Sequence, residues 1–238
     1  MQHKKNPSFN LDVLGLFLAG LINTFLAPVF AMIVFGPGTE ARQPDLYLRI
    51  EWIAENALQW KGGWLLWFAV TLSFAWSYYA LGRHLDGTRP WRSLAIGLAL
   101  IAAAVDLVGV LANLVILPEI AQALMDTPTQ MDPALVVFFQ SLENFSYALI
   151  NVSAFGLYSV AGLLLMPAAF ATPSYPRFLA WLGTAEWGMA TLATALLVIS
   201  PDLAMGPLLI SFALYAPWVW LSAYWLLRGK PVGLVQAL

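Results

Sequence analysis

Residues 94–117 read LAIGLALIAAAVDLVGVLANLVIL, an apolar run that contains one charged residue, Asp106. A helix of about 20 apolar residues crosses the ~30 Å hydrocarbon core of a bilayer. The whole chain has the same character, because 61% of its residues are hydrophobic and 10% are charged. Soluble domains have roughly 25% charged residues. The composition therefore predicts an integral membrane protein.

Five further apolar runs accompany this one. Helices are expected, because lipid cannot satisfy free backbone polar groups, and the alternating pattern of a membrane β-barrel is absent. Pro28 and Pro217 lie inside runs and predict kinks. The first run is too long for a signal peptide and is expected to remain as an uncleaved helix. The prediction is an all-α polytopic membrane helix bundle, a single domain over 1–238, with spans at 11–35, 63–82, 94–117, 136–167, 178–199 and 204–227.

The basic residues predict an orientation. Cytoplasmic loops carry an excess of Lys and Arg. With the N-terminus inside, the inner side holds eight of the 11 basic residues, and the outer loops collect acidic residues instead. We therefore expect both termini inside a cell (plasma) membrane, with these residues on the inner side: Lys4, Lys5, Arg83, Arg89, Arg92, Arg177, Arg228 and Lys230.

The first outer loop contains an amphipathic segment, DLYLRIEWIAENALQW at 45–60. Its apolar residues recur at helical spacing, which suits a helix lying in the headgroup plane. Trp60, Trp64 and Trp67 continue it as an interfacial aromatic belt. Two interpretations remain: an interfacial brace, or a lid over an outward-facing cavity.

The fourth run carries an unusual polar stretch, SLENFSYALINVSAFG at 141–156. At 100° per residue, its polar side chains fall within an arc of about 100° together with Gln140 and Tyr158. Such a stripe is expected to face protein or water. It supplies four candidates for ligand or proton binding: Glu143, Asn144, Tyr147 and Asn151.

Two other spans carry acids. Asp106 lies in the third span with Asn113 one heptad later, and Glu186 lies in the fifth. A charged group inside a bilayer costs about 2.5–3.5 kcal/mol. No Lys or Arg lies at a similar depth in the spans, so these acids and Glu143 are expected to be neutral. They either form a polar pocket or proton path between the third, fourth and fifth helices, or bond neighbouring helices, worth about 0.6–2 kcal/mol.

Missing residue types narrow the chemistry. The chain has no cysteine, its two histidines are His3 and His84, and no lysine lies inside a span. Thiolate chemistry, a bis-His haem within the spans and a retinal Schiff base are thereby excluded, and no cofactor or metal is predicted. No G-x-S-x-G, Walker or G-x-G-x-x-G motif occurs. The scattered basic residues form no stripe that would bind nucleic acid.

Residues 55–85 read ENALQWKGGWLLWFAVTLSFAWSYYALGRHL. They follow an N-terminal arm, a first helix and an amphipathic segment, and an acid-bearing helix comes next. This order resembles bacterial six-helix membrane proteins of unknown function, over about residues 10–165. The resemblance implies a six-helix fold and assigns no reaction or site residue.

The function expected from these observations is a polar intramembrane cavity that binds or passes a small molecule, ion or proton. Asp106 would be the midplane acid, Asn113 and Asn151 would line the pocket, and Glu186 and Glu143 would guard its inner and outer approaches. Two alternatives remain: a non-catalytic subunit or assembly factor, with membrane-protein partners or a homo-oligomer, or a carboxylate-based enzyme acting on lipid. The partner common to all three is the lipid bilayer.

Overall fold

The computed structural model describes residues 11–30, 36–40, 43–86, 89–126 and 132–228. Within them the regular structure is helical and contains no strand, which confirms the all-α prediction. The end of the predicted first run, 31–35, lies outside the described residues. The same is true of His3, Lys4, Lys5, Arg42 and Lys230.

Six helices in the described part of the chain are long and apolar enough to cross a membrane, as the sequence predicted. Four of them are single or nearly single helices: α1 (Leu11–Leu21) continued by α2 (Ala27–Phe30), α4 (Ala57–His84), α9 (Arg177–Ile199) and α10 (Pro201–Leu227). The third combines α5 (Arg89–Leu111) and α6 (Leu117–Met125), and the fourth combines α7 (Pro133–Tyr147) and α8 (Phe155–Ala171). These findings are compatible with a multi-pass membrane protein.

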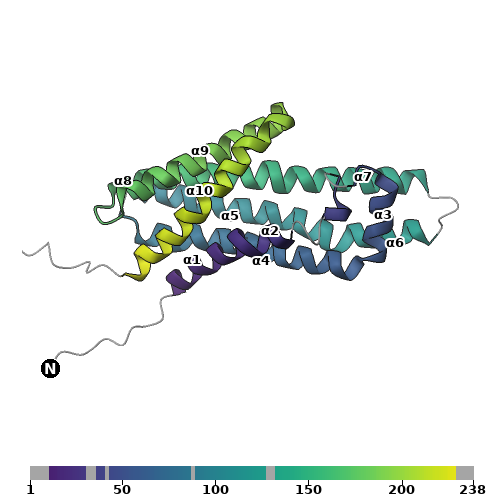
Figure 1. The fold of residues 1–238 in the computed structure, drawn as a ribbon, viewed down its shortest axis with the longest axis horizontal. Helices are drawn as coiled ribbons and strands as arrows, with labels where there is room; N and C mark the ends of the chain where they lie inside the picture. The colour runs from purple at the N-terminus through teal and green to yellow at the C-terminus, as the bar shows by residue number, and fades with distance from the viewer. Residues whose placement is uncertain (1–10, 31–35, 41–42, 87–88, 127–131, 229–238) are drawn as a thin grey trace, which may run out of the picture.

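The third and fourth helices are longer than the sequence predicted. They form candidate spans of 36 and 39 residues, Pro90–Met125 and Pro133–Ala171. At 1.5 Å per residue each is more than 50 Å long, well beyond the ~30 Å hydrocarbon core. Figure 1 shows their far ends extending past the α9–α10 hairpin. Roughly 25 Å of each helix is therefore available to build structure beyond a hydrocarbon core.

Among the described residues, three π-helical segments interrupt the long helices: η1 (Ile22–Leu26), η4 (Ala112–Ile116) and η5 (Ala148–Ala154). The first two end two residues before Pro28 and Pro118. A proline has no N–H and its ring clashes with the carbonyl four residues back, and a π-type turn relieves both problems without ending the helix. Pro217, in contrast, lies within the continuous helix α10.

Two separate groups of buried residues hold the bundle together. The larger, here called the main core, joins α1, α4, α5, α8, α9 and α10. The smaller, here called the α3 cluster, lies where α3 (Leu46–Glu55) crosses the far ends of the long helices (Figure 1). Its buried members are Ile50, Ile53, Trp60, Leu117, Ile120, Ala121, Leu124 and Phe139.

Helix α3 forms where the amphipathic pattern predicted a helix. The Asp45 carboxylate caps its N-terminus, accepting hydrogen bonds from the backbone N–H groups of Tyr47 (2.9 Å) and Leu48 (3.3 Å). Ile50 and Ile53 then face α6 and are fully buried. The apolar side of α3 therefore packs against protein.

The opposite end of the bundle is basic. Arg83, Arg92, Arg177 and Arg228 all lie at helix ends there. The turns at this end are connected, because the Asp86 N–H donates to the Thr172 hydroxyl (2.7 Å) and the Trp225 indole donates to the Ser174 carbonyl (2.8 Å). We call it the basic end, and the end that holds α3 the acidic end.

Candidate functional site

Asp106 lies between α4 and α5 in the middle of the bundle, and it is 5% exposed. Its Oδ2 accepts a hydrogen bond of 2.8 Å from the Thr71 hydroxyl on α4. The indole of Trp67, one turn away on α4, lies beside the same carboxyl. Its Oδ1 has no hydrogen-bond partner within the described part of the chain. Asp106 is therefore surrounded by neutral groups of α4 and by no described basic residue.

Glu186 is the second buried acid, 2% exposed between α9 and α10. Its Oε1 accepts a hydrogen bond of 3.3 Å from the Ser211 hydroxyl. Its Oε2, like Asp106 Oδ1, has no partner among the described residues. Neither acid forms an ion pair with a described basic residue. Their neighbours are hydroxyl groups and aromatic rings.

Two tyrosines occupy the space between the acids. The Tyr158 hydroxyl on α8 donates to the Thr71 carbonyl (3.3 Å), and the Tyr78 hydroxyl on α4 donates to the Tyr158 carbonyl (2.6 Å). Their rings stack with centroids 6.1 Å apart. The Tyr78 ring also lies 5.4 Å from the ring of Trp187, the residue next to Glu186. We call Asp106, Thr71, Tyr158, Tyr78 and Glu186 the acid–tyrosine network.

Packed aromatic rings surround Glu186. Trp187 contacts Tyr78, Tyr215 and Trp218, with ring centroids 5.4, 6.0 and 5.5 Å away. A close approach of helices makes room for this indole: a Cβ at Gly162 would lie 2.2 Å from it. Glycine at this point of α8 lets a large ring fill the α8–α9 interface. The network is therefore enclosed by closely packed side chains.

Glu143 corrects the prediction that the buried acids lack basic partners. Its Oε2 lies 2.8 Å from Nη2 of Arg49, a residue of α3 whose side chain is 3% exposed. Arg49 Nη1 also donates to the carbonyls of Gln43 (2.9 Å) and Pro44 (3.2 Å). The two partners are 94 positions apart, and the fold of α3 over α7 brings them together. Glu143 belongs to the acidic end and not to the acid–tyrosine network.

Asn113 is buried at the acidic side of the main core. Its side-chain amide donates to the Gly109 carbonyl (2.9 Å) and to the Ser146 hydroxyl. Its backbone carbonyl accepts a 2.8 Å hydrogen bond from the Trp60 indole. Asn113 thus links α4, α5 and α7. These hydrogen bonds give it a role in helix packing without any ligand.

The remaining candidates lie on the surface of α7 and η5. Asn144 and Tyr147 are exposed, and Asn151 is half-buried and bonds weakly to the Tyr147 carbonyl (3.4 Å). Tyr158, expected on the same stripe, is buried in the main core. The π segment η5 explains the difference, because its wider turn changes the phase of the helix between α7 and α8. The structure does not bring this stripe together in one pocket.

Sequence reasoning missed Thr71 and Tyr78. They lie one heptad apart on α4, which is the spacing that connects Asp106 with Asn113 in the third span. Helical spacing within the second span could therefore have found them. Their contacts with α5 and α8 could not be read from the sequence.

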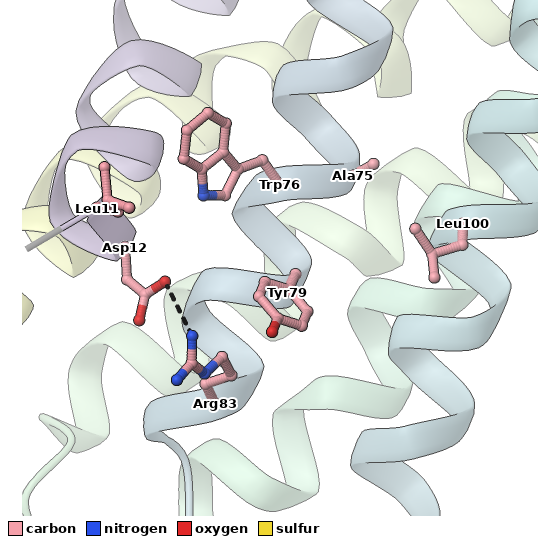
Figure 2. Close-up of a pocket in the computed structure, with 7 residues that line it drawn as sticks. All are labelled: Leu11, Asp12, Ala75, Trp76, Tyr79, Arg83 and Leu100. Atoms are coloured by element: carbon pink, nitrogen blue, oxygen red, sulfur yellow. Dashed lines mark ion pairs between the residues drawn. The ribbon is translucent and has the colours of Figure 1, made fainter.

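Two of the hollows at the surface of the described residues are of substantial size, and neither is lined by Asp106 or Glu186. One, of about 400 Å³, opens at the basic end between α1, α4 and α5 (Figure 2). The other, of about 500 Å³, lies between α5, α8 and α9. Among the described residues, no group of three or more His, Cys, Asp or Glu side chains is arranged to hold a metal ion.

Comparison of the chain with protein-family models, with curated proteins and with solved structures finds no match. The resemblance to bacterial six-helix membrane proteins therefore carries no further argument. The function has to be inferred from the site itself.

Proposed function

We propose that this multi-pass membrane protein binds or passes protons through the acid–tyrosine network. The observation that carries the proposal is the environment of Asp106 and Glu186: both are buried, neither forms an ion pair with a described basic residue, and Glu186 Oε2 has no hydrogen-bond partner among the described residues. Ionisable groups inside spans are costly, and they commonly belong to proton or ion pathways.

The network extends along the membrane normal. Asp106 lies roughly 25 Å from the basic end of its helix and Glu186 roughly 13 Å from the start of α9, at 1.5 Å per residue. Tyr158 and Tyr78 occupy the interval between them. Their hydroxyl protons point at backbone carbonyls, so transfer between the acids requires hydroxyl rotation or an inserted water. This conformation is the closed state of the proposed path.

The proposal includes an orientation. The concentration of arginine at the basic end supports a cytoplasmic position for that end, with both termini inside a plasma membrane. Helix α3 and the tryptophans of the acidic end would then lie at the outer surface. Because α3 buries its apolar side on protein, it serves there as a brace over the long helices.

Proton flux into liposomes tests the proposal. Purified protein is reconstituted with a pH-sensitive dye inside the vesicles, and a potassium diffusion potential drives the flux. Asp106→Asn and Glu186→Gln are expected to lower the flux by about tenfold or more, because an amide cannot exchange the proton. Asp202→Asn, an exposed acid on α10, is the matched control and leaves the flux unchanged.

Infrared carboxyl bands supply an independent readout. A band lost in Asp106→Asn or Glu186→Gln identifies each acid, and titration of that band with pH shows that protons reach it. The proposal is wrong if the bands neither titrate nor exchange in D₂O and the flux is unchanged in both variants. The two acids would then only form hydrogen bonds between helices.

A second candidate function is a subunit of a larger membrane assembly. The observation that favours it is the outward face of α7, where the side chains of Gln140, Asn144 and Tyr147 are exposed and form no hydrogen bond within the described part of the chain. A neighbouring membrane protein or a second copy would satisfy these groups. Purification in mild detergent with a stoichiometric partner would support it, and a monodisperse monomer would argue against it.

A further inference from the structure

The hollow at the basic end has apolar walls and one cation at its mouth. Figure 2 shows it against one face of α4, flanked by the start of α1 and by Leu100 of α5. Leu11, Ala75, Trp76 and Leu100 supply the apolar walls. Arg83 and Asp12 also line the hollow and form an ion pair of 3.7 Å at its mouth. An apolar channel that ends in a guanidinium at a helix terminus has the polarity of a lipid molecule.

The Trp76 wall of the hollow depends on the close contact between α1 and α4. A Cβ at Gly15 would lie 2.5 Å from the Trp76 indole nitrogen, so glycine is what allows the ring to lie against α1. Further along α4, the Arg83 guanidinium lies over the Tyr79 ring, 5.4 Å from its centroid. This stacking holds the cation at the mouth of the hollow.

Arg83 keeps its hydrogen-bond donors available. Asp12 lies in the same region, but its Oδ2 is 2.9 Å from His84 Nε2, whereas its Oδ1 is 3.7 Å from Arg83 Nη1. The second distance is too long for a hydrogen bond. The Arg83 side chain is 56% exposed and forms no hydrogen bond with any described residue. Its N–H groups can therefore donate to an anionic oxygen, and the ion pair they would exchange within the described residues is the longer of the two that Asp12 forms.

We propose that this hollow binds one anionic phospholipid, with an acyl chain along Trp76 and Leu100 and the phosphate on Arg83. The guanidinium binds phosphate through paired N–H donors. The other arginines of the basic end raise the local concentration of anionic headgroups. The site is independent of the acid–tyrosine network and of the function proposed for it.

Quenching of Trp76 tests the site. The full-length protein is placed in detergent micelles that contain phosphatidylglycerol or phosphatidylcholine with brominated acyl chains. The difference between the wild type and Trp76→Phe isolates the signal of this one indole. We expect phosphatidylglycerol to bind about fivefold more tightly than phosphatidylcholine, which is the effect of one basic residue at a membrane surface.

Arg83→Gln is expected to bring the two lipids to equal affinity. Arg83→Lys keeps the charge and restores most of the preference, which a misfolded variant would not do. Arg228 provides the matched control, because it lies over Tyr224 (4.6 Å) at the same end and does not line the hollow. Arg228→Gln leaves the preference intact.

Leu100→Trp fills the apolar part of the hollow and is expected to weaken binding of both lipids. Leu209→Trp, on the exposed surface of α10, does not. An unchanged preference in Arg83→Gln would overturn the proposal, as would an equal loss in Arg228→Gln. Displacement of the lipid by inorganic phosphate alone would show an anion site instead of a lipid site.

Discussion

Glu143 and Asp106 are carboxyl side chains on long apolar helices, and the fold surrounds them differently. Glu143, at the acidic end, has Arg49 at 2.8 Å and retains 21% of its side-chain exposure. Asp106, in the main core, has a threonine hydroxyl and no basic residue among the described neighbours. Glu186 repeats the second arrangement with Ser211.

Position along the bundle explains the difference. At the acidic end the helices extend beyond the thickness of a hydrocarbon core, so α3 can bring an arginine without burying it in lipid. Inside the core a second charge would need to be desolvated as well, and that cost often exceeds the gain from pairing. Neutral hydroxyl partners such as Thr71 and Ser211 avoid this desolvation cost. Glu143 is therefore part of an ion pair between helices, whereas the two core acids are bonded to hydroxyl groups.

Loss of Arg49 should have the largest effect. Arg49→Met leaves Glu143 without a cation and two carbonyls without their donor, so we expect the free energy of unfolding to fall by about 2–4 kcal/mol. Reversible unfolding in mixed SDS micelles measures it. The double variant Arg49→Met/Glu143→Gln should recover part of the loss. The exposed Arg177→Met serves as control, and an equal loss there would contradict the role of the pair.

High pH should weaken the basic end of the main core. Tyr175, in the turn between α8 and α9, bonds to the Ser222 hydroxyl at 2.8 Å, and burial raises its pKa to about 12. A raised pKa stabilises the fold below the unfolded value of 10, and this contribution is lost as the pH rises through 12. One pH unit above 10 should cost about 1.4 kcal/mol. Tyr175→Phe should remove this part of the pH dependence in unfolding measurements.

The Tyr158 hydroxyl should contribute a smaller amount. Tyr158→Phe removes its hydrogen bond to Thr71, with an expected cost of about 1 kcal/mol. Proton flux should fall in the same variant if the hydroxyl takes part in transfer. Tyr147→Phe removes an exposed hydroxyl and should change neither quantity. Lost stability with unchanged flux would place Tyr158 outside the path.

The smallest effect on stability should come from Asp106→Asn. An amide keeps an acceptor for the Thr71 hydroxyl and matches a neutral carboxyl in shape, so we expect a change below about 0.5 kcal/mol. Glu143→Gln should cost more, because it removes the charge that faces Arg49. Equal costs at the two positions in parallel unfolding experiments would remove the distinction between the two regions.

Helical periodicity worked within a span and failed across η5. It placed Gln140, Asn144 and Tyr158 on one stripe, yet Asn144 is exposed and Tyr158 is buried. The π segment between them has a wider turn than the assumed 100° per residue describes. Pro28 and Pro118 mark two of the three π segments, but no proline marks η5.

The sequence by itself determined that six apolar helices form and that Asp106 and Glu186 lie within them, because hydropathy and helical length depend on consecutive residues. It also indicated that α3 is amphipathic. Only the tertiary structure decided which acid has a cation, because Arg49 and Glu143 meet through the packing of helices far apart in the chain. It likewise placed Tyr78 and Tyr158 between the two core acids, an arrangement that depends on how α4, α5, α8 and α9 pack together.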